Sequence, residues 1–242
     1  MAKQFHFKQF SLHLCPDVFP LGTDACLLGA CAGADMPSPA RILDIGTGTG
    51  VVALMLAQRF DKSIVRGLDI HPAAARCASE NFAGSPWSGR LQTLCVSVQS
   101  FAGTQPAGSQ DLIVSNPPFF EGLTPSPDPM RQLSRHNAAL PDPEFMAAIR
   151  HLIHPVHGQA WVILPRDRAA LWCQKLPQHG LFPAFCCYVR RHPRLPYKRC
   201  LLAIRPWAGP CAHAYHTLNA NTKTNSYTAA TKKLWQDFYL HL

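Results

Sequence analysis

The chain has 242 residues, 47% of them hydrophobic, and a formal charge of +9 with histidine counted as neutral. This length and composition exclude a disordered chain, and no apolar run approaches the roughly 20 residues of a membrane span. Residues 1–8 contain no apolar segment of the kind that signal peptides carry. We therefore expect a cytoplasmic protein made of one domain, residues 1–242, and the excess of basic residues favours a polyanionic partner, nucleic acid first.

Apolar runs and turn residues predict strands that alternate with helices along most of the chain. A lead-in, residues 1–39, ends in a helix at 24–30, and Asp24 is the residue expected to cap it. The expected strands after it cover 41–45, 64–69, 91–98, 111–115, 159–164, 181–190 and 199–205. The expected helices of this core cover 51–60, 72–82, 143–153, 168–179 and 226–240.

This alternation predicts an α/β fold, a mostly parallel sheet with helices on both faces. We expect a seven-stranded sheet whose last strand is antiparallel, because only a short basic loop separates the last two strands. In such sheets ligands bind beyond the carboxyl ends of the strands, at the topological switch point. The residues that follow each strand are therefore the first candidates for a functional site.

A glycine-rich segment, Asp44-Ile45-Gly46-Thr47-Gly48-Thr49-Gly50, follows the first expected strand. Its glycines allow a tight turn and a close approach to a ligand at the N-terminus of the next helix. The G-x-G-x-G spacing differs from the G-x-G-x-x-G of nicotinamide dinucleotide sites, so an oxidoreductase is disfavoured and another adenosine ligand is favoured. Asp69 ends the second strand, where a carboxylate accepts hydrogen bonds from ribose hydroxyls.

A proline-rich segment, Asn116-Pro117-Pro118-Phe119, follows the fourth expected strand. Prolines carry no N–H, so the segment offers mainly acceptors: the Asn116 side-chain oxygen and the Pro117 carbonyl. Two acceptors match the two N–H groups of an exocyclic amino group, and Phe119 offers a face on which a base can stack. We therefore expect Asn116, Pro117 and Phe119 to hold an amino substrate for reaction.

These motifs resemble those of the class I S-adenosylmethionine-dependent methyltransferases that methylate amino groups. More specifically, the chain resembles the bacterial tRNA1(Val) adenine N6-methyltransferase family, in segments 7–10, 21–30, 54–59, 85–87, 194–196, 201–203 and 238–240. That family methylates the adenine immediately 3′ of the anticodon of a valine tRNA. The resemblance implies a Rossmann-like fold, S-adenosyl-L-methionine as cofactor and a tRNA anticodon stem-loop as partner.

The resemblance also assigns cofactor roles to residues outside the glycine loop. Thr23 and Asp24 match family residues near the methionine end of the cofactor. Ser97 stands where the family usually has an Asp that contacts the cofactor adenine. We expect this serine to weaken cofactor binding without abolishing it, because a neutral hydrogen bond still contributes about 0.5–1.5 kcal/mol.

Basic residues are expected on the rim of the same site, where they would bind phosphates. The loop between the last two strands should open on the cofactor side of the sheet, and residues 131–136 follow the proline-rich segment on that side. The expected RNA-binding residues are Arg131, Arg135, Arg190, Arg191, Arg194, Lys198 and Arg199.

Two alternatives to this function remain open at the level of sequence. The first is another amino substrate: a release-factor glutamine, or adenine in DNA or ribosomal RNA. The segment Asn116–Pro117 cannot discriminate among these, because a glutamine amide also carries two N–H donors. The second is a degenerate, non-catalytic RNA-binding protein, for which Ser97 is the single hint.

The ten cysteines show no C-x-x-C spacing, and we expect them to be reduced and mostly buried. We expect no metal site, because the cysteines lack the spacing of zinc motifs and because Pro155 and Gly158 break the helix that would align His151, His154 and His157. We expect a monomer.

Overall fold

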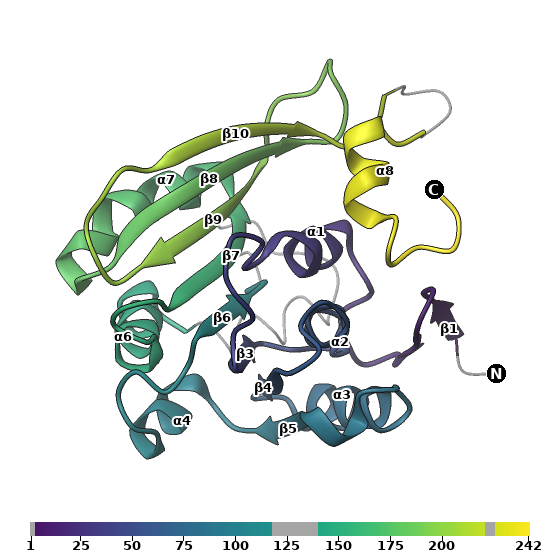
Figure 1. Cartoon of the computed structure of the whole chain (residues 1–242), viewed down its shortest axis with the longest axis horizontal. Coiled ribbons are helices and arrows are strands. Elements are labelled where there is room, and N and C mark those ends of the chain that lie inside the picture. The colour runs from purple at the N-terminus through teal and green to yellow at the C-terminus, as the bar shows by residue number, and fades with distance from the viewer. Residues whose placement is uncertain (1–2, 118–139, 221–225) are drawn as a thin grey trace.

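The structure, a computed structural model, describes residues 3–117, 140–220 and 226–242. Its main feature is an eight-stranded sheet with the strand order β10-β8-β9-β7-β6-β3-β4-β5 (Figure 1). The strands are β3 (Arg41–Ile45), β4 (Ile64–Asp69), β5 (Leu91–Cys95), β6 (Leu112–Ser115), β7 (Gln159–Pro165), β8 (Phe182–Arg190), β9 (Arg199–Arg205) and β10 (Ala212–Thr217). All neighbours are parallel except that β9 runs antiparallel to both β7 and β8. The carboxyl ends of the parallel strands therefore share one edge.

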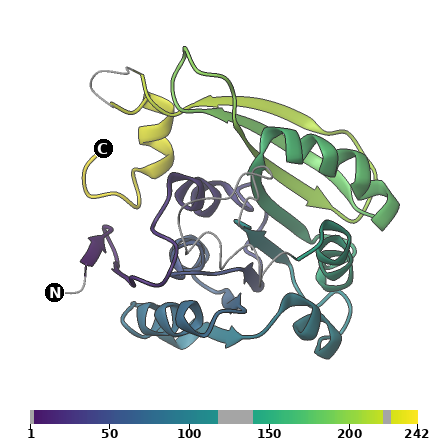
Figure 2. The same cartoon turned by 180° about the vertical axis from the view of Figure 1, so that it is seen from behind.

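Helices cover both faces of this sheet, and each face has its own hydrophobic core. One core includes residues of α1 (Thr23–Cys31), α2 (Val51–Arg59), α3 (Pro72–Ala83) and α8 (Ala229–Trp235). The other includes α4 (Val98–Thr104), α6 (Asp142–Leu152) and α7 (Arg166–Lys175), and α7 packs against β7, β8 and β9 (Figure 2). Two short 3-10 helices cover Ser88–Arg90 and Leu176–His179. None of the helices in the described ranges is long and apolar enough to cross a bilayer.

Helix α2 shows how the sequence positions the first of these layers. Its residues from Val51 to Ala57 are all buried, because α2 packs on β3 and β4 and also against α1, which lies on the same face of the sheet. A helix that is apolar all round is stable in water only when it is buried in this way. The lead-in is thus part of the core, and α2 is fixed directly beyond the glycine loop.

The α/β fold with a mostly parallel sheet and helices on both faces is confirmed, but three details of the expectation are wrong. The sheet has eight strands instead of seven, because the polar segment Ala212–Thr217 adds an edge strand parallel to β8. The antiparallel strand β9 lies between β7 and β8, inside the sheet and not at its end. The third expected strand, 91–98, ends at Cys95, because Ser97 caps α4.

The expected closing helix, 226–240, is shorter in the structure and covers only Ala229–Trp235. Thr228 caps it, since the threonine hydroxyl accepts a hydrogen bond from the Thr231 N–H at 3.1 Å. The chain beyond this helix turns back to the N-terminus, where the Lys8 N–H donates to the Phe238 carbonyl at 2.7 Å. The rings of Phe7 and Tyr239 pack edge to face there.

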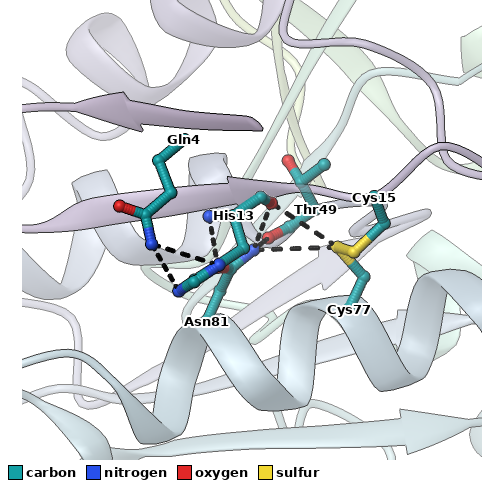
Figure 3. Close-up of a disulfide and its surroundings, with 6 residues drawn as sticks. All are labelled: Gln4, His13, Cys15, Thr49, Cys77 and Asn81. Carbon is teal, nitrogen blue, oxygen red and sulfur yellow. Dashed lines mark hydrogen bonds between the residues drawn. A yellow bond between two sulfur atoms is a disulfide. The ribbon is translucent and has the colours of Figure 1, made fainter. Parts of the chain in front are cut away.

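A separate two-stranded hairpin, β1 (Lys3–His6) and β2 (Ser11–Leu14), opens the described chain. Its second strand is fixed to α3 by the buried side chain of Asn81 (Figure 3). The Asn81 oxygen accepts from the His13 N–H at 2.7 Å, and its amide nitrogen donates to the carbonyls of His13 and Thr49 at 3.1 and 2.9 Å. Because Thr49 belongs to the glycine loop, this side chain links the hairpin, α3 and that loop.

A disulfide between Cys15 and Cys77 joins the end of this hairpin to α3, with Cα atoms 6.3 Å apart (Figure 3). The expectation that every cysteine is reduced is therefore wrong for this pair. No local spacing marks the two residues, which are 62 positions apart in the sequence and come together only because β2 packs on α3.

Removal of this disulfide tests its contribution to stability. We expect Cys77→Ser to lower the free energy of unfolding by about 2–4 kcal/mol, because the bridge restricts a long loop of the unfolded chain. Urea denaturation without reductant measures the difference, and Cys95→Ser, at an exposed free cysteine, is the matched control. Equal midpoints for wild type and Cys77→Ser would show that the bridge does not form in solution.

Candidate active site at the carboxyl edge of the sheet

The topological switch point of the sheet lies between β3 and β6. From β3 the chain continues to β4 and β5 on one side and then returns to β6 on the other side. Ile45 at the end of β3 pairs with Leu68 of β4 and with Ser115 of β6, and the Ser115 hydroxyl donates to the Ile45 carbonyl at 2.8 Å. The glycine loop, Asp69 and Asn116 therefore follow three neighbouring strands at one edge, where ligands of such sheets bind.

The glycine loop between β3 and α2 depends on left-handed backbone conformations. Gly46, Gly48 and Gly50 have φ values of 73°, 56° and 82°, in a region that other residues rarely adopt. A Cβ on Gly46 would meet no atom within 4 Å, so this turn borders open space. A Cβ on Gly50 would come within 2.5 Å of the Phe82 ring, so Gly50 is also required for the packing of α2 on α3.

The carboxylate of Asp69 holds this loop against the end of β4. Its Oδ2 accepts from the Gly48 N–H at 3.0 Å, and its Oδ1 accepts from the His71 N–H at 3.0 Å. Each carboxylate oxygen has a second lone pair, so both can accept a further hydrogen bond from a ligand hydroxyl. Asp69 thus shapes the loop and still offers acceptors at its rim.

Asp44 lies beneath the loop with only 1% of its surface exposed, and Thr47 Oγ1 donates to its Oδ2 at 2.7 Å. Burial, and to a smaller extent the charge of Asp69, raise the pKa of this carboxyl group from 3.8 to about 7, although hydrogen bonds with Thr47 and the Ala53 backbone lower it. None of the ion pairs found within the described ranges involves Asp44 or Asp69. An acidic floor without a resident cation favours a positively charged ligand.

Asn116 places an unsatisfied acceptor beside the glycine loop. Its side-chain Oδ1 is buried and has no hydrogen-bond partner among the described residues. An orphaned buried acceptor costs about 1–3 kcal/mol, so a donor supplied by a ligand is expected there. Pro117 follows directly, whereas Phe119, Arg131 and Arg135 lie outside the described residues.

The residues assigned to the two ends of the cofactor, Thr23 and Asp24 for the methionine and Ser97 for the adenine, lie at the starts of α1 and α4. Thr23 and Asp24 lie in the first turn of α1, but the N-cap is Gly22, so the expectation that Asp24 caps this helix is wrong. Asp24 Oδ2 instead accepts from Arg199 Nε at 2.8 Å. Ser97 caps α4, where its hydroxyl oxygen accepts from the Ser100 N–H at 3.1 Å.

The basic loop between β8 and β9 opens on this same edge, because β8 runs parallel to β7. Two of its expected RNA-binding residues are engaged within the protein. Arg190 donates to Thr217 Oγ1 and to the Pro193 carbonyl, at 2.9 and 2.8 Å, and Arg199 binds Asp24. The other three, Arg191, Arg194 and Lys198, are exposed.

Two residues that support the loop were not predicted from the sequence. Thr47 was overlooked although it stands three positions after Asp44. At this spacing a hydroxyl can donate a hydrogen bond to a carboxylate across a tight turn. Asn81 gave no local signal, because its partners at His13 and Thr49 are far away in the sequence.

Comparison with known proteins agrees with this arrangement. The family described as "Methyltransferase small domain" matches residues 28–140. The structure is similar to a protein from Agrobacterium tumefaciens described as a predicted O-methyltransferase, with a TM-score of 0.62, 18% sequence identity, and coverage of 89% of this chain and 96% of the other. The Rossmann-like fold and the glycine loop at its switch point define the class: the chain is a methyltransferase.

Curated relatives narrow this class to a family. The tRNA1(Val) (adenine(37)-N6)-methyltransferase of Porphyromonas gingivalis is 38% identical over 97% of this chain and 94% of its own length. The protein of the same name from Bacteroides fragilis is 35% identical over 98% of both chains. The chain belongs to the tRNA1(Val) (adenine(37)-N6)-methyltransferase family.

The raised pKa of Asp44 predicts how stability depends on pH. Between pH 4 and 7 the folded protein binds more protons than the unfolded chain, so Asp44 makes folding less favourable as pH rises through this window. We expect Asp44→Asn to gain stability over wild type, by roughly 2–3 kcal/mol more at pH 8 than at pH 5. Urea denaturation at both pH values measures this, with Asp61→Asn at an exposed turn as the control. A gain of the same size at both pH values would contradict the raised pKa.

Proposed function

We propose that this protein transfers a methyl group from S-adenosyl-L-methionine to N6 of the adenine that follows the anticodon of a valine tRNA. The observation that carries the proposal is the buried, unpartnered Oδ1 of Asn116 beside the glycine loop. The names of the curated relatives support the same substrate. We further propose that residues 1–242 act as one methyltransferase domain and as a monomer in the cytoplasm.

The residues at the switch point fit this cofactor. Gly46 and Gly48 leave space for close approach to the backbone, and the free lone pairs of Asp69 suit the two ribose hydroxyls. The acidic floor formed by Asp44 suits a ligand that carries a sulfonium cation. Ser97 keeps one lone pair for the adenine amino group, because its other acceptor position and its proton are used within α4.

Thr23 and Asp24 remain proposed neighbours of the methionine end of the cofactor. Asp24 is held in place by Arg199, which reaches it from the start of β9. This ion pair fixes the first turn of α1 against the rim of the site. We propose that Arg199 positions Asp24 beside the methionine end of the cofactor. Its exposed neighbours Arg191, Arg194 and Lys198 are then the proposed RNA-binding residues of this loop.

The bound cofactor supplies an electrophilic methyl group, so the protein's main task is to position the acceptor nitrogen. Asn116 Oδ1 and the Pro117 carbonyl accept the two N–H groups of the adenine, and the nitrogen lone pair is then directed at the methyl group. The cofactor would keep the electron pair of its S–C bond on sulfur, while Asn116 and Pro117 hold the amino group and one amino proton would leave to solvent. Phe119 is proposed to stack on the base.

The exposed cations of the basic loop are the proposed phosphate contacts. Arg191, Arg194 and Lys198 lie on the edge that carries the glycine loop, and Arg131 and Arg135 are proposed to extend the same surface. Arg190 braces the loop from within, with its guanidinium 4.7 Å from the centre of the Tyr197 ring. An unpaired anticodon-loop base can be splayed into a site beside such a surface at modest cost.

Substitution of Asn116 tests the proposed function directly. We expect Asn116→Ala to lower methyl transfer by at least about 100-fold, because an acceptor aimed at the reacting group is lost, while cofactor affinity stays within about twofold. Transfer of label to tRNA, ribosomal RNA, DNA and release factor measures rate and substrate together. Asn116→Asp, which keeps acceptor oxygens, should retain more activity than Asn116→Ala.

Two outcomes of this experiment would contradict the proposal. Label that reached protein or DNA but not tRNA would assign the site to another amino substrate. Unchanged transfer by Asn116→Ala would remove the proposed role of its side-chain oxygen.

The exposed cations predict a change in the salt dependence of tRNA binding. Each single substitution, Arg191→Ala, Arg194→Ala or Lys198→Ala, should reduce the slope of log K against log salt by roughly one, because each removes one phosphate contact. Filter binding to tRNA at several salt concentrations measures the slope. Arg66→Ala, whose side chain bonds to Gln92 between β4 and β5, is the control. Slopes equal to wild type would place the RNA elsewhere.

A further inference from the structure

A cluster of soft ligands lies near the β10 edge of the sheet, apart from the site described above. It is formed by Cys186 in β8, Cys211 directly before β10, and His213 in β10, and one ligand atom of each lies within 4.8 Å of the others. The two sulfur atoms are 3.7 Å apart. Cys186 is buried, Cys211 is half-buried and His213 is exposed, so the cluster reaches from the core to the surface.

Strand register explains why these three side chains meet. His213 is paired directly with Cys186 across the parallel β8–β10 ladder. Residues two apart in an extended segment point to the same face, which brings Cys211 beside His213. The sequence therefore places a Cys-Ala-His step opposite a cysteine, a pattern visible only once the unexpected strand β10 is known.

Two further thiols surround the buried cysteine. Cys173, on α7, packs against the same hydrophobic core cluster that contains Cys186. Cys200 belongs to the same cluster and lies on the neighbouring strand β9, two positions from Leu202, the residue that pairs with Cys186. The four thiols thus lie in or against one hydrophobic core cluster, and His213 lies beside Cys186 and Cys211 at its exposed end.

We propose that Cys186, Cys211 and His213 bind a zinc ion, with Cys173 or Cys200 as the fourth ligand. A tetrahedral zinc with Zn–S bonds of about 2.3 Å keeps its sulfur atoms about 3.8 Å apart, close to the observed separation. Thiolate and imidazole together are the donors that select zinc over the hard cations. Each cysteine thiol releases its proton to solvent as its Zn–S bond forms.

The site would be structural, since four protein ligands leave no open position on the metal. Cys186 lies four residues before the end of β8, roughly 13 Å from the carboxyl edge at about 3.3 Å per residue. The metal would join β10, which is largely exposed, to β8 and either α7 or β9. Its loss should therefore loosen this edge of the sheet without touching the glycine loop.

Metal titration of the purified, reduced full-length chain tests the proposal. Cobalt(II) is added first, because its bonds to thiolates give charge-transfer absorption, and zinc is then used to displace it. We expect one metal per chain and a zinc-dependent rise in the unfolding temperature. His213→Ala, at an exposed position, and Cys211→Ser should lose both signals. Cys187→Ser is the matched control, because Cys187 packs against the opposite core.

Further variants locate the fourth ligand and exclude other thiols. Loss of the cobalt signal in Cys173→Ser or in Cys200→Ser identifies that ligand, and retention in both would overturn the four-ligand site. Cys15→Ser should bind normally, which excludes the thiols released from the reduced disulfide. Absence of stoichiometric metal, or binding by His213→Ala as tight as wild type, would overturn the proposal. So would a Cys186–Cys211 disulfide in the unreduced protein together with no metal uptake after reduction.

Discussion

The carboxyl edge of the sheet is organised by two carboxylates beneath one turn of backbone. Asp44 binds the Thr47 hydroxyl and Asp69 binds the Gly48 N–H, so the loop between β3 and α2 is fixed from below and from the side. Burial of two neighbouring acids opposes folding, as the raised pKa of Asp44 shows. A cationic ligand bound beside two buried acids offsets part of this electrostatic cost. The sulfonium group of the proposed cofactor is such a cation.

The N-terminal lead-in, residues 1–39, makes contacts that hold the glycine loop in place. Asn81 connects β2 to Thr49, and the disulfide at Cys15 anchors the same strand to α3 one helical turn away from Asn81. At the other end of the lead-in, the ion pair between Asp24 and Arg199 connects α1 to the start of β9. Segments far apart in the sequence therefore support one binding surface, and its rigidity is a property of the whole fold.

The sequence was sufficient for features whose signals are local. The alternation of apolar strands and helices predicted the α/β fold, and the glycine spacing with Asp69 located the loop at the switch point. Features that depend on tertiary contact were missed: the edge strand β10, whose polar residues Ala212–Thr217 lack an apolar pattern, and the disulfide between residues 62 apart. The cluster of Cys186, Cys211 and His213 was missed for the same reason, since the strand register brings Cys186 opposite His213.

The overall charge of +9 conceals two opposite electrostatic requirements at one edge. The floor of the site is acidic and suits a cation, whereas the loop between β8 and β9 is basic and suits RNA phosphates. The ion pair of Arg199 with Asp24 lies at the boundary and neutralises one charge of each kind. Exposed charges are screened over about 8–10 Å in physiological salt, whereas a buried carboxylate is screened far less. Under the proposed function, the rim would attract the polyanionic tRNA while the acidic floor favours the cationic cofactor, so the two would be drawn to different depths of the same site.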